Sequence, residues 1–170
     1  LPMGYTLEQF AADCRTALKA DPGPAGRETV KQFVSKALKD KELCAKYLHD
    51  NVEKERTVLY EDPELGFCIC GHVYNDQRQG SPHDHGPTWA IYGQAEGETS
   101  MTDWEIVSPA SGDTPAKVKL ARTYSLKPGD AHVYNEGDVH APYRDKPTRL
   151  IRIEGVDTMT VKRTKVEIVE

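Results

Sequence analysis

The 170-residue sequence predicts a mostly β protein, in which a small sandwich or closed barrel follows an N-terminal segment of two to three helices. Apolar residues recur at helical spacing through about the first 50 residues. From Thr57 onward the chain changes to short runs rich in Val, Ile, Tyr and Thr, and clusters of turn-forming residues separate these runs. Because closely spaced short strands close into a sandwich or barrel, we expect the helices to pack outside it.

The first predicted helix covers about residues 7–20. Thr6 and Gln9 have the form of a capping box, in which each residue satisfies a backbone N–H of the first turn. The Asp21-Pro22-Gly23-Pro24 segment ends this helix. A second apolar stripe runs from Val30 to Leu38, and a third, shorter one lies around Tyr47. The first 50 residues are therefore expected to be helical.

The predicted strands cover about residues 57–60, 66–74, 88–93, 97–107, 116–126, 131–135, 138–143, 148–154 and 159–169. Turn clusters such as Lys127-Pro128-Gly129-Asp130 separate them. No linker divides the chain, and a chain of this length suits one core. We therefore expect residues 1–170 to form a single domain, with helices in residues 1–50 packing on a β-barrel of residues 56–170.

The composition narrows the class of partner. The net charge is −5 and acidic and basic residues are interspersed, so no basic stripe is available for a phosphate backbone and nucleic acid is not expected. No apolar run reaches the roughly 20 residues that span a bilayer, and no membrane association is expected. We expect a cytoplasmic monomer or homodimer. Cys68 and Cys70 alternate within an apolar run and are expected to be reduced core thiols.

His83-Asp84-His85 is the most informative tripeptide. In a strand, residues two apart point to the same face, so both imidazoles can enter the barrel while Asp84 faces outward. Two imidazoles on one face can bind one cation, and a third histidine would complete a facial set that leaves coordination positions open. His132 and His140 both occupy plausible strand positions, and spacing alone does not choose between them. Glu96 and Glu98 are weaker candidates because they follow a turn.

These residues resemble two motifs of the cupin superfamily. Gly80-Ser81-Pro82-His83-Asp84-His85 followed by Glu96-Gly97 is similar to the first motif, and Pro128-Gly129-Asp130 leading to His140 is similar to the second. More narrowly, nearly the whole chain resembles the thiol dioxygenases of the cysteine dioxygenase type. The resemblance implies a double-stranded β-helix, or jelly-roll, barrel and selects His140 as the third ligand. It also implies ferrous iron, with zinc, nickel or manganese as alternatives.

Two features of the sequence depart from the resembled pattern. The stretch after His85 holds no carboxylate, which favours a set of three neutral histidines. Ala90 stands where animal cysteine dioxygenases carry the cysteine that is crosslinked to a tyrosine, so no crosslink is expected. Tyr92, Tyr134 and Tyr143 could each supply a phenol but are interpreted as packing residues.

The resemblance implies a small acidic thiol and O₂ as substrates and a sulfinate as product. The substrate carboxylate would need an arginine inside the barrel. Arg56 matches the substrate-binding arginine of the family by position, and Arg152 is an equal candidate. Alternation in the last of these strands places Leu150, Arg152 and Glu154 on one face. In the family this strand carries a histidine and a tyrosine, so Arg152 and Glu154 indicate a different set of substrate contacts.

Two other classes of function fit the same residues. One is a cupin enzyme that uses its metal without O₂, as an isomerase, decarboxylase or hydrolase. The other is a cupin that binds a ligand without turnover. Fold alone does not choose among these functions.

Overall fold

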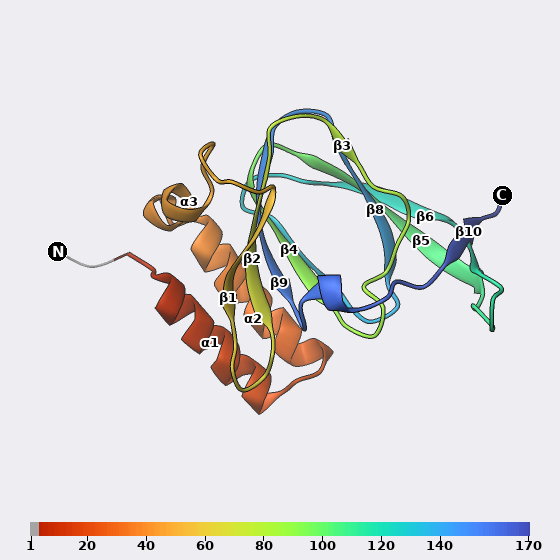
Figure 1. Cartoon of the computed structure of the whole chain (residues 1–170), viewed down its shortest axis with the longest axis horizontal. Helices are drawn as coiled ribbons and strands as arrows, with labels where there is room; N and C mark the ends of the chain where they lie inside the picture. Colours follow the sequence, from red (N-terminus) through yellow and green to blue (C-terminus); the bar gives the residue numbers. More distant parts are fainter. Residues whose placement is uncertain (1–3) are drawn as a thin grey trace.

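The computed structural model describes residues 4–170, so the first three residues of the predicted 1–170 domain lie outside the described range. Within this range three helices precede the strands (Figure 1). The helices are α1 (Leu7–Ala20), α2 (Pro24–Leu38) and α3 (Lys41–Tyr47). The first predicted helix is confirmed, and so is its capping box between Thr6 and Gln9. None of the helices in residues 4–170 has the length and apolar character needed to cross a membrane.

The strands form two sheets of five strands each. The first sheet has the order β1-β2-β9-β4-β7, with β1 (Arg56–Glu61), β2 (Cys68–Tyr74), β9 (Thr148–Glu154), β4 (Ala90–Glu96) and β7 (Ala131–Tyr134). The second has the order β10-β6-β5-β8-β3, with β10 (Val166–Ile168), β6 (Ala116–Leu126), β5 (Thr99–Ser108), β8 (Val139–Arg144) and β3 (Arg78–Gln79). All pairings are antiparallel except that of β10 with β6.

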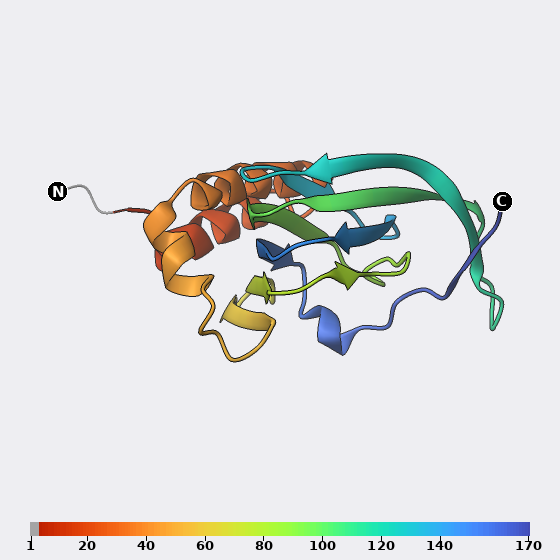
Figure 2. The ribbon, with the colours of Figure 1, turned by 90° about the horizontal axis from the view of Figure 1, so that it is seen from above.

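The helices cover the outer face of the first sheet, and the curled second sheet lies opposite its inner face (Figures 1 and 2). Ile69, Ile91, Ile151 and Ile153 point outward and pack with the helices in the largest apolar cluster. The predicted alternation in β9 is therefore confirmed, because Ile151 and Ile153 face the helices. Two facing sheets with N-terminal helices on one side confirm the predicted fold class, a mostly β double-stranded β-helix, or jelly roll, with an N-terminal helical segment.

Residues 159–169 do not form the predicted single strand. They contain the end of a 3₁₀ helix, η1 (Thr158–Thr160), an extended stretch without sheet pairing, and the short strand β10. The stretch between them, Lys162-Arg163-Thr164-Lys165, is polar, and its apolar residues are too few to bury one face of a strand. The sequence patterns also missed β3, which is only two residues long.

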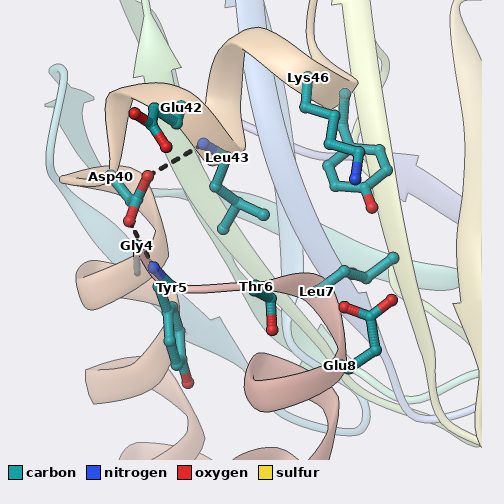
Figure 3. Close-up of a pocket in the computed structure, with 10 residues that line it drawn as sticks. Gly4, Tyr5, Thr6, Leu7, Glu8, Asp40, Glu42, Leu43 and Lys46 are labelled. Atoms are coloured by element: carbon teal, nitrogen blue, oxygen red, sulfur yellow. Dashed lines mark hydrogen bonds between the residues drawn. The ribbon is translucent and has the colours of Figure 1, made fainter. Parts of the chain in front are cut away.

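Asp40 joins the N-terminal segment to α3 (Figure 3). Its carboxylate accepts the backbone N–H of Tyr5 at 2.6 Å and that of Leu43 at 3.0 Å. The second bond caps the start of α3, where backbone N–H groups have no partner within the helix. A hollow opens between these two segments, but no residue that lines it belongs to a barrel strand. This hollow therefore lies outside the β-barrel.

Candidate metal centre

Three buried histidines meet between the two sheets. His140 lies on β8, while His83 and His85 lie on the segment between β3 and β4. A pair of backbone hydrogen bonds fixes the approach of the two segments: His83 N–H donates to His140 C=O at 3.0 Å, and His140 N–H donates to His83 C=O at 2.9 Å. One ring nitrogen of each histidine lies within 4.8 Å of those of the other two. The arrangement could hold one metal ion.

The His83-Asp84-His85 segment is not the strand that the alternation assumed. His83 forms an isolated bridge, and β4 begins only at Ala90. Asp84 does not face outward but is 3% exposed, which corrects the sequence interpretation. Its Oδ1 accepts the backbone N–H of Gly86 at 3.0 Å and that of Thr164 at 2.9 Å. The buried Asp84 thus fixes the turn that brings His85 toward His83, and short Asx turns of this kind are local in sequence.

His132, the alternative third histidine, does not join the cluster. It lies on β7 with its ring stacked on Tyr134 at 4.5 Å and on Tyr124 at 5.2 Å between centroids. Its Nε2 lies 3.2 Å from the Arg122 guanidinium. Tyr134 also packs against His140, with ring centroids 4.0 Å apart, and so lies between the two histidines. Of the two candidates, the structure brings only His140 to His83 and His85.

Burial keeps the three imidazoles neutral. Desolvation lowers the pKa of His83 to about 4 and that of His85 to about 2, and it lowers the pKa of His140 well below its ordinary value. A neutral imidazole has the lone pair that a metal requires. In His83 the proton is on Nδ1, because this atom lies 2.8 Å from the Ser81 carbonyl oxygen and donates a hydrogen bond to it. The Nε2 lone pair of His83 is therefore free to bind a metal.

The polar atoms of the cluster are under-satisfied by the protein alone. His85 and His140 each have a buried Nδ1 with no hydrogen-bond partner in residues 4–170. Their Nε2 atoms share one hydroxyl neighbour, that of Tyr92, at 3.0 and 3.2 Å. One hydroxyl carries one hydrogen and can donate to only one of the two nitrogens. An ion bound through the Nε2 atoms would take up the lone pair that the Tyr92 hydroxyl leaves without a donor, so this set of nitrogens fits a metal that binds imidazole.

Arg152 is the charged residue that lies against the cluster. Its Nη2 is 3.5 Å from His85 Nε2, and its guanidinium lies 4.4 Å from the centre of the Tyr92 ring. Its side chain is 12% exposed, and its Nε is a buried donor with no acceptor in the described residues. An acidic ligand beside the histidines would find an unused donor there.

Glu154 connects Arg152 to Arg56. The fully buried carboxylate lies 3.0 Å from Arg152 Nη2 and accepts a 2.8 Å hydrogen bond from Arg56 Nη2. It also accepts bonds from the backbone N–H and the hydroxyl of Thr158. Burial alone would raise the pKa of Glu154, but Arg152, the Thr158 N–H and Arg56 together lower it. Arg56 makes a further ion pair with Asp157 at 2.9 Å. The structure therefore places Arg152 next to the histidines and Arg56 behind Glu154.

Sequence reasoning missed two residues near this centre. Tyr92 was interpreted as packing, although alternation in the predicted strand 88–93 places it on the same face as Ala90, which faces the barrel interior. Arg144 was not considered. It lies four residues after His140 on β8 and is 5% exposed, and no described carboxylate forms an ion pair with it. Alternation along β8 places Pro142 and Arg144 on the same face as His140, and this period of two could have predicted the inward position of Arg144.

The fold and the cluster together define a β-barrel of two facing sheets with a three-histidine site that could hold a metal ion. No protein-family model matches the chain, and no curated protein sequence does so. Its fold is similar to a cupin superfamily protein from Desulfitobacterium hafniense, with 15% identity, 60% of this chain and 76% of the other covered, and a TM-score of 0.44.

Two further solved structures have comparable similarity. A protein with a double-stranded β-helix domain from Klebsiella pneumoniae has 16% identity, with 72% of this chain and 88% of the other covered, and a TM-score of 0.48. A hydroquinone 1,2-dioxygenase, solved with Cd²⁺ and 4-hydroxybenzonitrile, has 16% identity, with 70% and 71% covered, and a TM-score of 0.47. The finer resemblance to cysteine dioxygenase stays a prediction.

Proposed function

We propose that this protein is a mononuclear non-haem iron dioxygenase that oxidises a small acidic thiol to its sulfinate. The observation that carries the proposal is the position of Arg152, whose Nη2 lies 3.5 Å from His85 in the cluster of three neutral, buried histidines. Three histidines provide a metal set with open positions, and a buried arginine with an unused donor provides a partner for an acidic group. A catalytic metal and an anion site side by side favour an enzyme over a passive binding protein.

The proposed reaction balances without another co-reactant. One thiol and one O₂ give one sulfinic acid, both oxygen atoms end on sulfur, and sulfur loses four electrons to O₂. A ferrous ion held by His83, His85 and His140 would supply electron density for O₂ and a binding position for the thiolate. Because the three ligands are neutral imidazoles, the ion would keep its full charge, which favours an anionic substrate.

Arg152 would orient the substrate. Its Nη2 forms a 3.0 Å ion pair with one oxygen of Glu154, and Thr158 and Arg56 donate hydrogen bonds to the other oxygen, so the carboxylate restricts the position of the guanidinium. Its Nε remains available for a carboxylate. Such fixed positioning shortens the search for a reactive geometry. Arg56, the other candidate, is already paired with two carboxylates and is assigned to holding Glu154.

The test is anaerobic reconstitution with Fe(II), followed by oxygen-electrode readings with a set of small thiol acids and with matched thiols that lack the carboxylate. We expect O₂ uptake equal to the sulfinate formed, with preference for the thiol acids. Absence of uptake with every thiol acid would remove the thiol assignment. Tight retention of zinc, nickel or manganese, with turnover of an oxygen-rich acid under anaerobic conditions, would favour the O₂-independent alternative.

The matched variants are His140→Ala and His132→Ala. Both remove a buried or half-buried imidazole near Tyr134, but only His140 belongs to the cluster. We expect His140→Ala to lose bound iron and His132→Ala to keep it. Equal iron content in the two variants would show that the cluster is not the metal site.

A further inference from the structure

Tyr92 brings a hydroxyl to the point where the imidazole nitrogens converge. It lies on β4, is 2% exposed, and its Oη is 3.0 Å from His85 Nε2 and 3.2 Å from His140 Nε2. Contacts on two sides hold the ring, because Arg152 lies 4.4 Å from its centre and Tyr134 packs at 4.9 Å. The position of the hydroxyl is therefore determined by packing and not by a flexible side chain.

A metal ion at the cluster would change the partners of this hydroxyl. Among the residues that the structure describes, the phenol has hydrogen-bond contacts only with the two imidazole nitrogens. If those nitrogens gave their lone pairs to an ion, the phenol could no longer donate to them. A buried hydroxyl without a partner is unfavourable, and binding the ion through oxygen would remove that penalty.

The spacing of the three atoms fits a shared ion. Ligands at bond lengths of about 2.1 Å that occupy neighbouring positions of an octahedron lie about 3.0 Å apart, and those of a tetrahedron lie about 3.4 Å apart. The two distances from Tyr92 Oη to the nitrogens fall in this range. An ordinary hydrogen bond has the same length, so the argument rests on one oxygen being close to two ligand nitrogens together.

No other side chain competes for that position. The metal-ligating cluster within residues 4–170 contains no carboxylate and no thiol besides the three histidines. On β4 the preceding inward residue is Ala90, whose methyl group leaves the space in front of the histidines to the longer side chain of Tyr92. The phenol is thus the oxygen donor that the fold directs at the site.

We propose that Tyr92 Oη is a fourth protein ligand of the metal, which leaves two open positions in a six-coordinate site. The proposal rests on the metal site of the proposed function but not on its reaction. Binding to a ferric ion forms an oxygen–metal bond, breaks the phenolic O–H bond and releases its proton to solvent. Two open positions still suffice for one thiolate and one O₂.

The test uses the optical signature of an iron(III)–phenolate bond. The full chain is loaded anaerobically with one equivalent of Fe(II), oxidised with ferricyanide, and examined by visible absorption and resonance Raman spectroscopy. We expect a visible charge-transfer band with enhanced tyrosine ring modes in the native protein. Tyr92→Phe should lose the band while it retains iron, with affinity reduced roughly tenfold.

Tyr134→Phe is the matched control. Tyr134 is equally buried and its ring packs on His140, but its hydroxyl lies 2.7 Å from that of Tyr124 and away from the histidine nitrogens. The control should keep the charge-transfer band. A native protein that binds one iron without the band would overturn the proposal, and so would a band that persists in Tyr92→Phe.

The outcomes separate this inference from the function. Iron with the phenolate band but no thiol turnover would support Tyr92 as a ligand and contradict the dioxygenase. Thiol turnover by an iron-loaded protein without the band would support the dioxygenase and contradict Tyr92 as a ligand. Failure of the native protein to bind any metal would overturn both.

Discussion

Asp84 and Thr164 lie 80 positions apart in the sequence, yet the Asp84 carboxylate accepts the Thr164 backbone N–H at 2.9 Å. The same oxygen accepts the N–H of Gly86, one residue beyond His85. This carboxylate therefore ties the C-terminal segment between η1 and β10 to the turn that carries two of the histidines. The C-terminal segment is part of the support of the site.

Replacement of Asp84 should weaken both the attachment of the C-terminal segment and the turn that carries His83 and His85. Asp84→Ala removes a buried acceptor and leaves two backbone N–H groups without their partner, so we expect the free energy of unfolding to fall by roughly 1–3 kcal/mol. Denaturant unfolding of the native protein and of Asp84→Ala measures this decrease in the free energy of unfolding. Asp113→Ala, in the exposed turn after β5, is the control and should change little. Equal effects of the two substitutions would contradict the anchoring role.

Gly86 should tolerate no side chain. Its φ is +63°, and a Cβ there would lie 2.2 Å from the Lys162 carbonyl oxygen. Gly112 has a similar φ of +56°, but a Cβ added there would have no other atom within 4 Å. Gly86→Ala should therefore lose roughly 1–3 kcal/mol of unfolding free energy, and Gly112→Ala about 1 kcal/mol or less. The difference, measured by denaturant unfolding, isolates the contact with the C-terminal segment. Equal losses would show that this contact is unimportant.

The sequence paired His83 with His85 by strand alternation, and the two side chains do meet, although the segment is not a strand and the turn at Asp84 brings them together. It did not allow His132 and His140 to be separated. Both lie on strands next to interior tyrosines, and the choice depends on how β7 and β8 are placed in different sheets. The backbone bridge between His83 and His140 decides it, and that pairing is non-local.

The contacts of Arg152 and Arg56 with Glu154 also combine a local pattern, which the sequence predicts, with a non-local pairing, which it does not. Alternation placed Arg152 and Glu154 on one face of β9, which local sequence can predict. The ion pair of Glu154 with Arg56 is non-local, because it spans β2, which lies between β1 and β9. The burial of Asp84 was predicted wrongly for a similar reason. Its second partner, Thr164, belongs to a segment that the patterns assigned to a strand.

His72 makes the stability of the protein without bound metal depend on pH. Burial and the nearby Arg152 and Arg144 lower its pKa well below the ordinary value, so the unfolded chain binds a proton that the folded protein excludes. Stability is therefore lost as pH falls below about 6.5, the unfolded value, by roughly 1.4 kcal/mol per pH unit for this group. The buried histidines of the cluster add to the slope in the same direction.

Urea unfolding in the presence of a chelator, at steps between pH 7.5 and pH 5, measures this slope. We expect His72→Phe to have a shallower decline than the native protein over that window. The unfolding free energy of His72→Phe at pH 7.5 measures a separate effect, the loss of the 2.8 Å contact between His72 Nδ1 and the Tyr74 hydroxyl. An unchanged slope would show that His72 is protonated as readily in the folded state as in the unfolded one.

Arg144 is a buried cation whose only described hydrogen bond is from its Nε to the Thr99 hydroxyl at 3.1 Å. Burial lowers the pKa of Arg144, because it destabilises the charged form of the side chain. Arg144→Met keeps much of the volume and removes the charge, so the unfolding free energy should stay level or rise by up to about 2 kcal/mol. Arg152→Met removes the ion-pair partner of the buried Glu154 Oε2 and should lower the unfolding free energy. A marked loss in Arg144→Met would show that the charge has a partner beyond these contacts.

The roles of Arg152 and Arg56 can be separated by steady-state kinetics with whichever thiol acid proves active. Arg152→Lys keeps the charge but loses the fixed fork beside His85, so we expect KM to rise roughly tenfold or more while iron content is unchanged. Arg56→Lys keeps an ion pair with Glu154 and should change KM less, because Arg56 acts on the substrate only through Glu154 and Arg152. A thiol without a carboxylate should show no difference between Arg152→Lys and the native protein. If Arg56→Lys instead gives the larger rise in KM, Arg56 binds the substrate carboxylate and Glu154 must move away from it when the substrate enters.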